Sequence, residues 1–254
     1  MSANLSHAGD SVRRRVAAVV VVAMPEEARP FLEHLPRSEG ALPLELPGGA
    51  EAWPLTLSGG RELLLVRSGI GLVASASALA TVLTQADPQI IVSAGTTGGL
   101  GREVEVGDVC VSTDLAYMDV DATAFGYAPG QTPGQPATFA GDPGLVARAG
   151  AVLGALRAAT PASGTARIHA GQMLAGGSFV TAANVKDTRE RFPQAISTDM
   201  ESTALAQVAH AAGIPFASIR GVSDLCGPEA GQDFHIGAEE AAARSAAVVL
   251  SALA

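Results

Sequence analysis

The sequence predicts a three-layer α/β/α fold with a central mixed, mainly parallel sheet. Apolar strand-like runs alternate along the chain with alanine-rich segments whose spacing suits helices, and this alternation is typical of such a sheet. The run PQIIVSAG (residues 88–95) is apolar almost without interruption, as in strands that are buried on both faces. With 254 residues, of which 48% are hydrophobic, the chain is long enough to bury one sizeable core.

The first half of the chain begins with strand-like runs at Val16–Met24 and Leu63–Val66. The segment SGIGLVASASALATVLTQ (residues 68–85) has the apolar spacing of a helix that follows a glycine turn. Residues 88–95 form the next predicted strand, and VEVGDVCVST (residues 104–113) reads as two short strands around a Gly-Asp turn.

The second half opens with a loop, Asp121–Phe139, whose Gly/Pro/Ala-rich sequence is long enough to suggest a function beyond connection. One helix is expected over Asp142–Ala158 with Asp142 as its N-cap, and another over Thr198–Ala212, ended by Gly213. The remaining predicted elements are a strand and glycine turn in HAGQMLAGGSFV, a strand in IPFASIRGVSD and a closing helix over Ala238–Ala254.

Neither a repeat nor a linker interrupts residues 16–254, so the sequence indicates a single domain preceded by a polar extension, residues 1–15, expected to be disordered. Three arginines followed by VAAVVVVAM resemble the charged and apolar parts of a secretory signal. The apolar run is short, lacks a small-x-small cleavage site and continues into PEE, which favours a buried strand. No stretch is long enough to span a bilayer, so no membrane partner is expected.

Charge and the chemistry-bearing side chains argue against several classes of function. The net charge of −9 gives an acidic surface, which argues against a nucleic-acid partner. Cys110 and Cys226 have neither metal nor redox spacing, so we interpret them as free thiols of a reducing, cytoplasmic compartment. The five histidines are dispersed without the pairing of a zinc site, and we expect neither a metal nor a cofactor.

Several groups are expected at the carboxyl ends of predicted strands, where open α/β sheets bind ligands. They are Glu26 and Glu27 after the first strand, the turn GTTGG (Gly95–Gly99), Phe179 in a glycine turn, Glu201 at a helix start, and Asp224 after the last strand. Each has a structural alternative. Glu26 and Glu27 suit a helix N-terminus, Thr198-x-x-Glu201 fits a capping box, and an aspartate such as Asp224 is common in a turn after a strand. GTTGG could be any tight turn, and the phenylalanine a core aromatic. Convergence of three acids and a glycine turn on one sheet edge favours a binding site without naming its ligand.

Seven motifs then follow one another in a recognisable order. They are AMPEEA, SGIGLVASA, AGTTGGL, VGDVCVS, DVDATAFGYAPGQTPGQPATF, FPQAISTDMESTALAQVAH and IRGVSDLCG. Together they resemble the bacterial 5′-methylthioadenosine/S-adenosylhomocysteine nucleosidases, within the purine nucleoside phosphorylase family, and imply a nucleoside phosphorylase/hydrolase-like fold from Val16 to the C-terminus. The pair DMES…RGVSD indicates only the superfamily, whereas DATAFGYAPGQTPG is specific to the nucleosidase branch.

That family hydrolyses the N-glycosidic bond of an adenine nucleoside that carries a thioether at its 5′ carbon. By resemblance, Glu27 would activate the attacking water, Glu201 would hold the ribose hydroxyls, and Asp224 would face purine N7 and the exocyclic amine. The other implied substrate contacts are Met200 beside the ribose, Arg220 and Ser223 supporting the aspartate and the water, Phe179 and Val180 at the purine, and Met24, Ile70 and Phe234 around the 5′-alkylthio group. Phe125 and Pro133 resemble residues that reach into a neighbouring subunit, which implies a homodimer with shared active sites.

The sequence departs from the family pattern at two places, the glycine turn and residue 199. The glycine turn has Thr96 and Thr97 before Gly98 where the nucleosidases usually have Ser-Ala, so the second threonine adds bulk near the sugar and base. Residue 199 is Asp rather than the usual Glu. Neither change removes a catalytic group, so both bear on substrate fit rather than on reaction type.

The chemistry of the leaving group agrees with these roles. Adenine is a poor leaving group unless a ring nitrogen is protonated as the bond breaks, so an acid must face N7 while a carboxylate activates water across the sugar. The apolar positions suit a thioether, which prefers contact surface to hydrogen bonds.

Three alternatives remain at the level of sequence. A purine nucleoside phosphorylase needs an anion site, whereas SAGTTGGLG has no cation before Arg102 and Glu27 would repel phosphate. A futalosine-type hydrolase would differ only in the 5′ substituent. A non-catalytic nucleoside-binding protein of this fold would not need a water-activating carboxylate.

Overall fold

The computed structural model describes residues 13–40, 44–226 and 236–254. Its strands are β1 (Arg14–Val16), β2 (Ala18–Val22), β3 (Leu44–Glu45), β4 (Glu51–Thr56), β5 (Glu62–Arg67), β6 (Ala86–Pro88), β7 (Ile91–Gly99), β8 (Val109–Tyr117), β9 (Phe139–Ala140), β10 (Ile168–Ala175), β11 (Ala195–Asp199) and β12 (Phe216–Asp224). Its α-helices are α1 (Pro25–His34), α2 (Leu72–Leu83), α3 (Pro143–Ala151), α4 (Leu153–Ala158), α5 (Val185–Arg191), α6 (Ser202–Ala212) and α7 (Ala238–Leu253).

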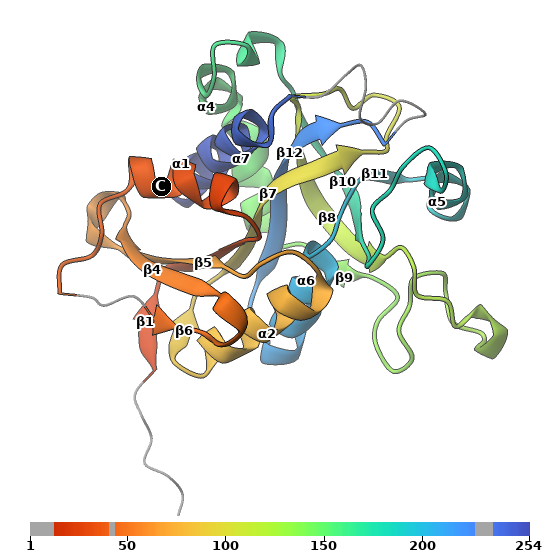
Figure 1. Ribbon diagram of the computed structural model, residues 1–254, viewed down its shortest axis with the longest axis horizontal. Helices are drawn as coiled ribbons and strands as arrows, with labels where there is room; N and C mark the ends of the chain where they lie inside the picture. The colour runs from red at the N-terminus through yellow and green to blue at the C-terminus, as the bar shows by residue number, and fades with distance from the viewer. Residues whose placement is uncertain (1–12, 41–43, 227–235) are drawn as a thin grey trace, which may run out of the picture.

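Ten strands form one mixed sheet in the order β11-β10-β8-β12-β7-β2-β5-β4-β3, with β9 paired to β8 (Figure 1). Strands β5, β2, β7 and β12 are mutually parallel, and so are β8, β10 and β11. Strands β12 and β8 are antiparallel. The predicted mixed sheet therefore contains two parallel groups that run in opposite directions, and β3, β4 and β9 are added to it in antiparallel pairs.

Strand β7 closes one part of this sheet into a ring. Its last residues, Gly98 and Gly99, pair antiparallel with Thr198 and Ser197 of β11, while the strand also pairs with β12. Strands β11, β10, β8, β12 and β7 are thus paired in a closed circuit. Because β7 and β11 overlap only near their carboxyl ends, the closure brings the carboxyl ends of both parallel groups to one place.

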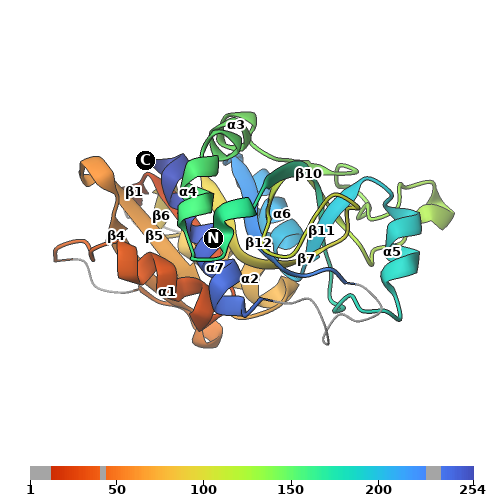
Figure 2. The ribbon, with the colours of Figure 1, turned by 90° about the horizontal axis from the view of Figure 1, so that it is seen from above.

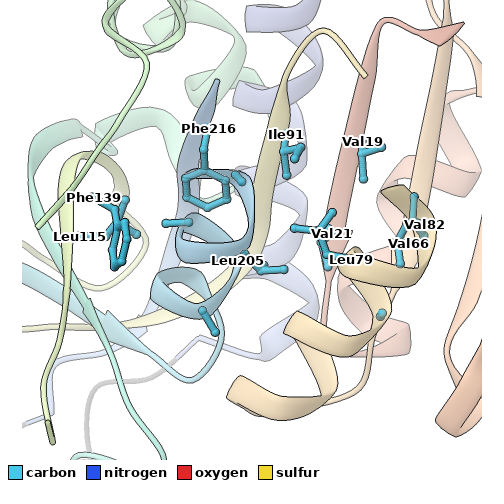
Figure 3. Packing of buried hydrophobic residues seen from close by; sticks show 14 of the residues in the cluster. Val19, Val21, Val66, Leu79, Val82, Ile91, Leu115, Phe139, Leu205 and Phe216 are labelled. Carbon is cyan, nitrogen blue, oxygen red and sulfur yellow. The ribbon is translucent and has the colours of Figure 1, made fainter. Parts of the chain in front are cut away.

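Helices cover both faces of the sheet, which confirms the three predicted layers (Figure 2). On one face, Val19 and Val21 pack in a single apolar cluster with Leu79 of α2 and Leu205 of α6 (Figure 3). On the other face, Val20 belongs to a cluster that includes side chains of α1, α3, α4 and α7. Side chains alternate between the faces along a strand, so β2, with every residue buried, contributes to both clusters.

The loop and the capped helix of the second half are confirmed. Between β8 and β9 the chain forms no strand or α-helix and only a 3-10 turn, Thr123–Phe125, and this segment projects from the body in both ribbon views (Figures 1 and 2). The Asp142 side chain accepts a hydrogen bond of 2.7 Å from the backbone N–H of Leu145, as expected of an N-cap. The predicted helix after it is interrupted at Val152, which separates α3 from α4.

The segment expected to be two short strands forms only one. Residues 104–107 are a turn, because the carboxylate of Asp108 accepts hydrogen bonds from the backbone N–H groups of Glu105 and Arg167. Gly107 also adopts a φ of 88°, which turns the chain before β8 begins.

Two other predicted boundaries are wrong. Thr198 and Asp199 end strand β11, paired with β10 and β7, so the following helix begins at Ser202 rather than at Thr198. At the N-terminus, Arg14 and Arg15 lie in β1 because they pair in parallel with β6, although the expected disordered extension included them.

Candidate active site

A cavity of about 180 Å³ lies where the two parallel groups meet. Its lining follows the carboxyl ends of β2, β5, β7, β10, β11 and β12. The lining residues are Ala23, Met24, Glu27, Ile70, Thr96, Thr97, Gly98, Ser178, Phe179, Val180, Thr198, Asp199, Met200, Glu201, Arg220, Ser223, Asp224 and Cys226. The strand ends that the sequence indicated therefore do share one site.

Glu27, in the first turn of α1, is only 1% exposed and has every oxygen lone pair in use. Its Oε2 accepts hydrogen bonds from the backbone N–H groups of Ala23 and Met24, at 2.8 and 3.1 Å. Its Oε1 accepts from the N–H and the hydroxyl of Thr96, at 2.7 and 3.0 Å. A Cβ at Gly95, whose φ is 129°, would collide with this carboxylate, so only glycine lets β7 pass so close.

Arg220 of β12 is 1% exposed and connects several parts of the site. Its Nη1 donates to the carbonyl of Thr96 at 2.9 Å, and its Nη2 donates to Ser93 Oγ at 2.8 Å. The guanidinium lies 3.2 Å from Glu201 Oε2 and 3.4 Å from Asp199 Oδ2. Burial alone would lower the pKa of this guanidinium, but the two carboxylates outweigh burial and raise it, so the group stays a cation.

Asp199, rather than a capping box, satisfies the start of helix α6. Its Oδ1 accepts hydrogen bonds from the backbone N–H groups of Glu201 and Ser202, at 2.8 and 2.7 Å. The Glu201 side chain instead accepts a hydrogen bond of 2.8 Å from the backbone N–H of Gly71. The capping-box interpretation of Thr198 and Glu201 is therefore wrong, and the Glu201 carboxylate lies in the cavity.

Glu201 is 4% exposed, and its surroundings raise the pKa of its carboxyl group above the ordinary value. Burial is the largest cause, and the negative charges of Asp199 and Glu27 act in the same direction. The Arg220 charge and the Gly71 N–H oppose them. Three buried acids thus share one cation on this side of the cavity.

Asp224, at the end of β12, has one donor on each oxygen. The hydroxyl of Ser223 donates to Oδ2 and the backbone N–H of Cys226 to Oδ1, both at 3.0 Å. Cys226 has a φ of 51°, unusual for a residue other than glycine, and its sulfur packs where a Cβ on Gly98 would lie. Burial, together with the neighbouring aspartate, raises the pKa of the Cys226 thiol to about 12, so it is an uncharged wall group at neutral pH.

The apolar part of the cavity is more open. Phe179 is 64% exposed and Ile70 is 58% exposed, whereas Val180 is buried. Asn184 holds the backbone around the aromatic ring: its amide donates to the Phe179 carbonyl at 3.2 Å, and its Oδ1 accepts from the N–H of Thr181 at 2.8 Å. The exposed ring is therefore not a core aromatic but presents its surface at the cavity.

All but three of the predicted site residues line this cavity. Phe125, which is 84% exposed, and Pro133 lie instead on the projecting loop between β8 and β9 (Figure 1). Phe234 lies outside the described residues.

The cavity also contains functional side chains that sequence reasoning left out of the site. Thr198, Asp199 and Cys226 line it, as do Ala23 and Ser178. If residues 195–199 had been recognised as a strand, Asp199 would have been placed at the carboxyl end of that strand, among the other candidate site residues. Cys226 carried no comparable signal, because its place depends on the turn that follows Asp224.

Within the described residues, no cluster of three or more His, Cys, Asp or Glu side chains could hold a metal ion. In the same part of the chain, no helix combines the length and apolar character needed to cross a membrane.

The charge balance limits what the cavity can bind. Arg220 is the only cation among the described lining residues, and Asp199 and Glu201 flank it. Glu27, in the first turn of α1, and Asp224, at the end of β12, add two further carboxyl groups. Such a cavity stabilises a ligand or transition state that develops positive charge, and the cavity itself repels anions.

Comparison with known proteins gives a consistent result. A model of the phosphorylase superfamily matches residues 17–254. The 5′-methylthioadenosine/S-adenosylhomocysteine nucleosidase of Chromohalobacter salexigens is 38% identical over 237 residues, 93% of this chain and 95% of that protein. The structure of the corresponding nucleosidase of Colwellia psychrerythraea, in complex with adenine, matches with a TM-score of 0.83 and 33% identity over 95% of each chain. The S-adenosylhomocysteine nucleosidase of Streptococcus pyogenes, in complex with 5-methylthiotubericidin, matches with a TM-score of 0.81 and 31% identity, over 96% of this chain and 98% of that one.

Proposed function

The chain belongs to the 5′-methylthioadenosine/S-adenosylhomocysteine nucleosidases of the phosphorylase superfamily, and from this premise we propose how its residues carry out the reaction. It is an N-glycosidic hydrolase that releases adenine from 5′-thio-substituted adenine nucleosides. The observation that carries the residue assignment is the buried Glu27 carboxylate in the first turn of α1 together with Asp224 at the end of β12, both lining the same cavity.

Glu27 is the general base that activates water. Its four hydrogen bonds occupy the roughly four lone-pair sites that a carboxylate offers, so water must displace one donor. Three of these donors are backbone N–H groups fixed by β2, α1 and β7, whereas the Thr96 hydroxyl can rotate. The Thr96 hydroxyl is therefore the donor that gives way, and it can then turn to hold the same water.

Asp224 is the residue that faces purine N7 and the exocyclic amine. Ser223 and the Cys226 N–H hold its carboxyl group in one orientation, which fixes the direction in which a proton or hydrogen bond can be offered to the base. Phe179 supplies a flat apolar surface for the purine, beside Val180. Met24 and Ile70 offer the contact surface that a thioether prefers.

Glu201 and Met200 hold the ribose, and the buried acids favour its positive charge as the glycosidic bond breaks. The same acids make phosphorolysis unfavourable, because a phosphate nucleophile would approach Glu27, and Arg220, the cation among the described lining residues, already faces Asp199 and Glu201. Hydrolysis, not phosphorolysis, is the reaction that this charge balance supports.

The working form is a homodimer with shared active sites, and residues 16–254 act as one nucleosidase domain. The support for the dimer is the exposed Phe125 and Pro133 on a projecting loop, together with the open apolar side of the cavity at Ile70 and Phe179. A cytoplasmic location is proposed on the two free cysteines, Cys110 and Cys226. Sedimentation of active enzyme tests the dimer, and a fully active monomer would overturn it.

Adenine release from 5′-methylthioadenosine, measured with and without added phosphate, tests the reaction. We expect the same rate in both conditions, with free 5-methylthioribose as the second product. A strict requirement for phosphate, with a sugar phosphate as product, would replace hydrolysis by phosphorolysis.

A further inference from the structure

A chain of buried serines leads from Arg220 into the centre of the protein. Arg220 donates from Nε and Nη2 to Ser93 Oγ of β7, at 3.3 and 2.8 Å. Ser93 Oγ lies 3.0 Å from Ser202 Oγ of α6, which lies 2.8 Å from Ser218 Oγ of β12. All three serines are 0% exposed, so water cannot substitute for any of these contacts.

The arginine fixes the direction of this chain. A guanidinium has donors and no acceptor, so Ser93 must accept from it and must give its own single proton to Ser202. Ser202 then has its proton left for Ser218. The hydroxyl dipoles of Ser93 and Ser202 therefore point the same way, with their negative ends toward Arg220, and each bond strengthens the next.

Packing alone does not require these hydroxyls. The serines join β7, α6 and β12 between the apolar clusters of the core, where side chains such as Ala209 and Ile219 are equally buried. A buried hydroxyl without a partner is costly, and Arg220 supplies the two donors that Ser93 accepts. The hydroxyls thus belong with the arginine rather than with the core.

Arg220 transmits their position to two groups of the site. Its Nη1 donates to the Thr96 carbonyl, whose residue also holds Glu27, and the same nitrogen faces Glu201 Oε2. Ser93 holds the other side of the guanidinium plane. A guanidinium is planar and rigid, so when Ser93 holds the Nε and Nη2 edge, the position of Nη1 is set as well.

We propose that Ser93, Ser202 and Ser218 are positioning residues that set Arg220, and through it Glu201, for binding of the ribose hydroxyls. The inference rests on the proposed nucleosidase reaction and on the role of Glu201 in it. It predicts that removal of a hydroxyl weakens ribose recognition most at Ser93, less at Ser202 and least at Ser218, in the order of their distance from Arg220 along the hydrogen-bonded serines.

The test is the ratio of kcat/KM for 5′-methylthioadenosine to that for its 2′-deoxy analogue, measured in Ser93→Ala, Ser202→Ala and Ser218→Ala. One lost hydrogen bond changes a rate by about 3- to 10-fold, so we expect the ratio to fall by about 10-fold in the first, about 3-fold in the second and less in the third. Melting temperatures are measured alongside and need not follow this order.

Ser163→Ala is the matched control. Ser163 is also 0% exposed and bonds to the carbonyls of Arg157 and Thr160, away from the cavity. It should lower stability and leave the ratio unchanged, as any loss of a buried hydroxyl would do if the role were structural only.

Three results would count against these statements. An unchanged ratio in folded Ser93→Ala and Ser202→Ala, or an equal fall in Ser163→Ala, overturns the positioning role. If Ser93→Ala does not fold, the order of Ser202→Ala and Ser218→Ala decides, and the reverse order overturns the proposal. Failure of the unmodified protein to release adenine overturns the proposed function instead.

Discussion

The two sides of the cavity differ in burial: the ionic side, which carries Glu27 and Arg220, is enclosed by the chain, whereas the apolar side, which carries Phe179 and Ile70, is open. Glu27 and Arg220 are each 1% exposed, and each makes several hydrogen bonds within the chain. On the apolar side, Phe179 is 64% and Ile70 58% exposed, and Phe125 stands apart on its loop at 84%. The groups proposed for the chemistry are therefore preorganised by one chain, whereas the surface proposed for the base and the thioether is open in the single chain.

This difference predicts that changes on the ionic side lower kcat, while changes on the apolar side raise KM. The largest effect is expected for Glu27→Gln. Loss of a general base typically costs about 10²–10⁴-fold in rate, which adenine release by the purified variant would measure.

The same substitution should also lower stability, because the glutamine amide cannot accept the hydrogen bonds that one carboxylate oxygen now receives. The glutamine NH2 group would face buried N–H or O–H donors, which should lower the free energy of unfolding by about 1–3 kcal/mol. Urea unfolding measures this loss. Activity close to that of the unmodified protein would return Glu27 to the role of a helix-terminus residue.

Asp224→Asn comes next and separates proton donation from orientation. An amide can hydrogen-bond to N7 but cannot protonate it, so hydrolysis of adenine nucleosides should fall by about 10²–10³-fold. The amide still accepts from Ser223 or Cys226, and the melting temperature should change little. A nitrophenyl riboside with the same 5′ thioether needs no leaving-group proton and should lose far less rate; equal losses on both substrates would make Asp224 an orienting residue.

Phe125→Ala tests the open, apolar side of the cavity. The side chain is 84% exposed in the single chain, so its removal should leave the stability of a subunit within about 0.5 kcal/mol. If it completes the neighbouring site, burial of its ring there should be reflected in a KM about 10-fold higher, with kcat nearly unchanged. A lower kcat at constant KM would contradict the proposed division between the two sides.

The smallest expected effect is a pH dependence that belongs to the ionic side. The pKa of Glu201 is raised, mainly by burial, so between its ordinary value and the raised value the folded protein binds more protons than the unfolded chain. The stability contributed by this group is therefore present below the ordinary pKa and is lost as pH rises through the raised one.

Glu201→Gln removes this titration. The free energy of unfolding of the variant, relative to the unmodified protein, should increase as pH rises through that window and level off above it. Urea unfolding at several pH values checks the slope, and a difference that does not change with pH would show that the surroundings do not raise the pKa of Glu201.

The sequence predicted the layers and most of the site because both follow from strand ends. The apolar run 88–95 and the IRGVSD strand are strong patterns, and in the structure these two strands pair in parallel with Gly98 opposite Asp224. Strand β11 was missed because AISTD is short and half polar, and with it the position of Asp199 was lost. The role of Ser202 could not be predicted, because a serine at a helix start is ordinary and only the fold brings it to Ser218.

The pairing of Gly98 and Gly99 with Thr198 and Ser197 has a consequence for the order of folding. These partners are separated by about a hundred positions along the chain, and such long-range contacts form late because a large loop must close first. Until β11 reaches β7, the ends of the two strand groups are apart, and no partly folded species can hold Glu201, which follows β11, beside Arg220 of β12. During refolding, recovery of adenine release should therefore coincide with the slowest phase and lag behind the formation of helices.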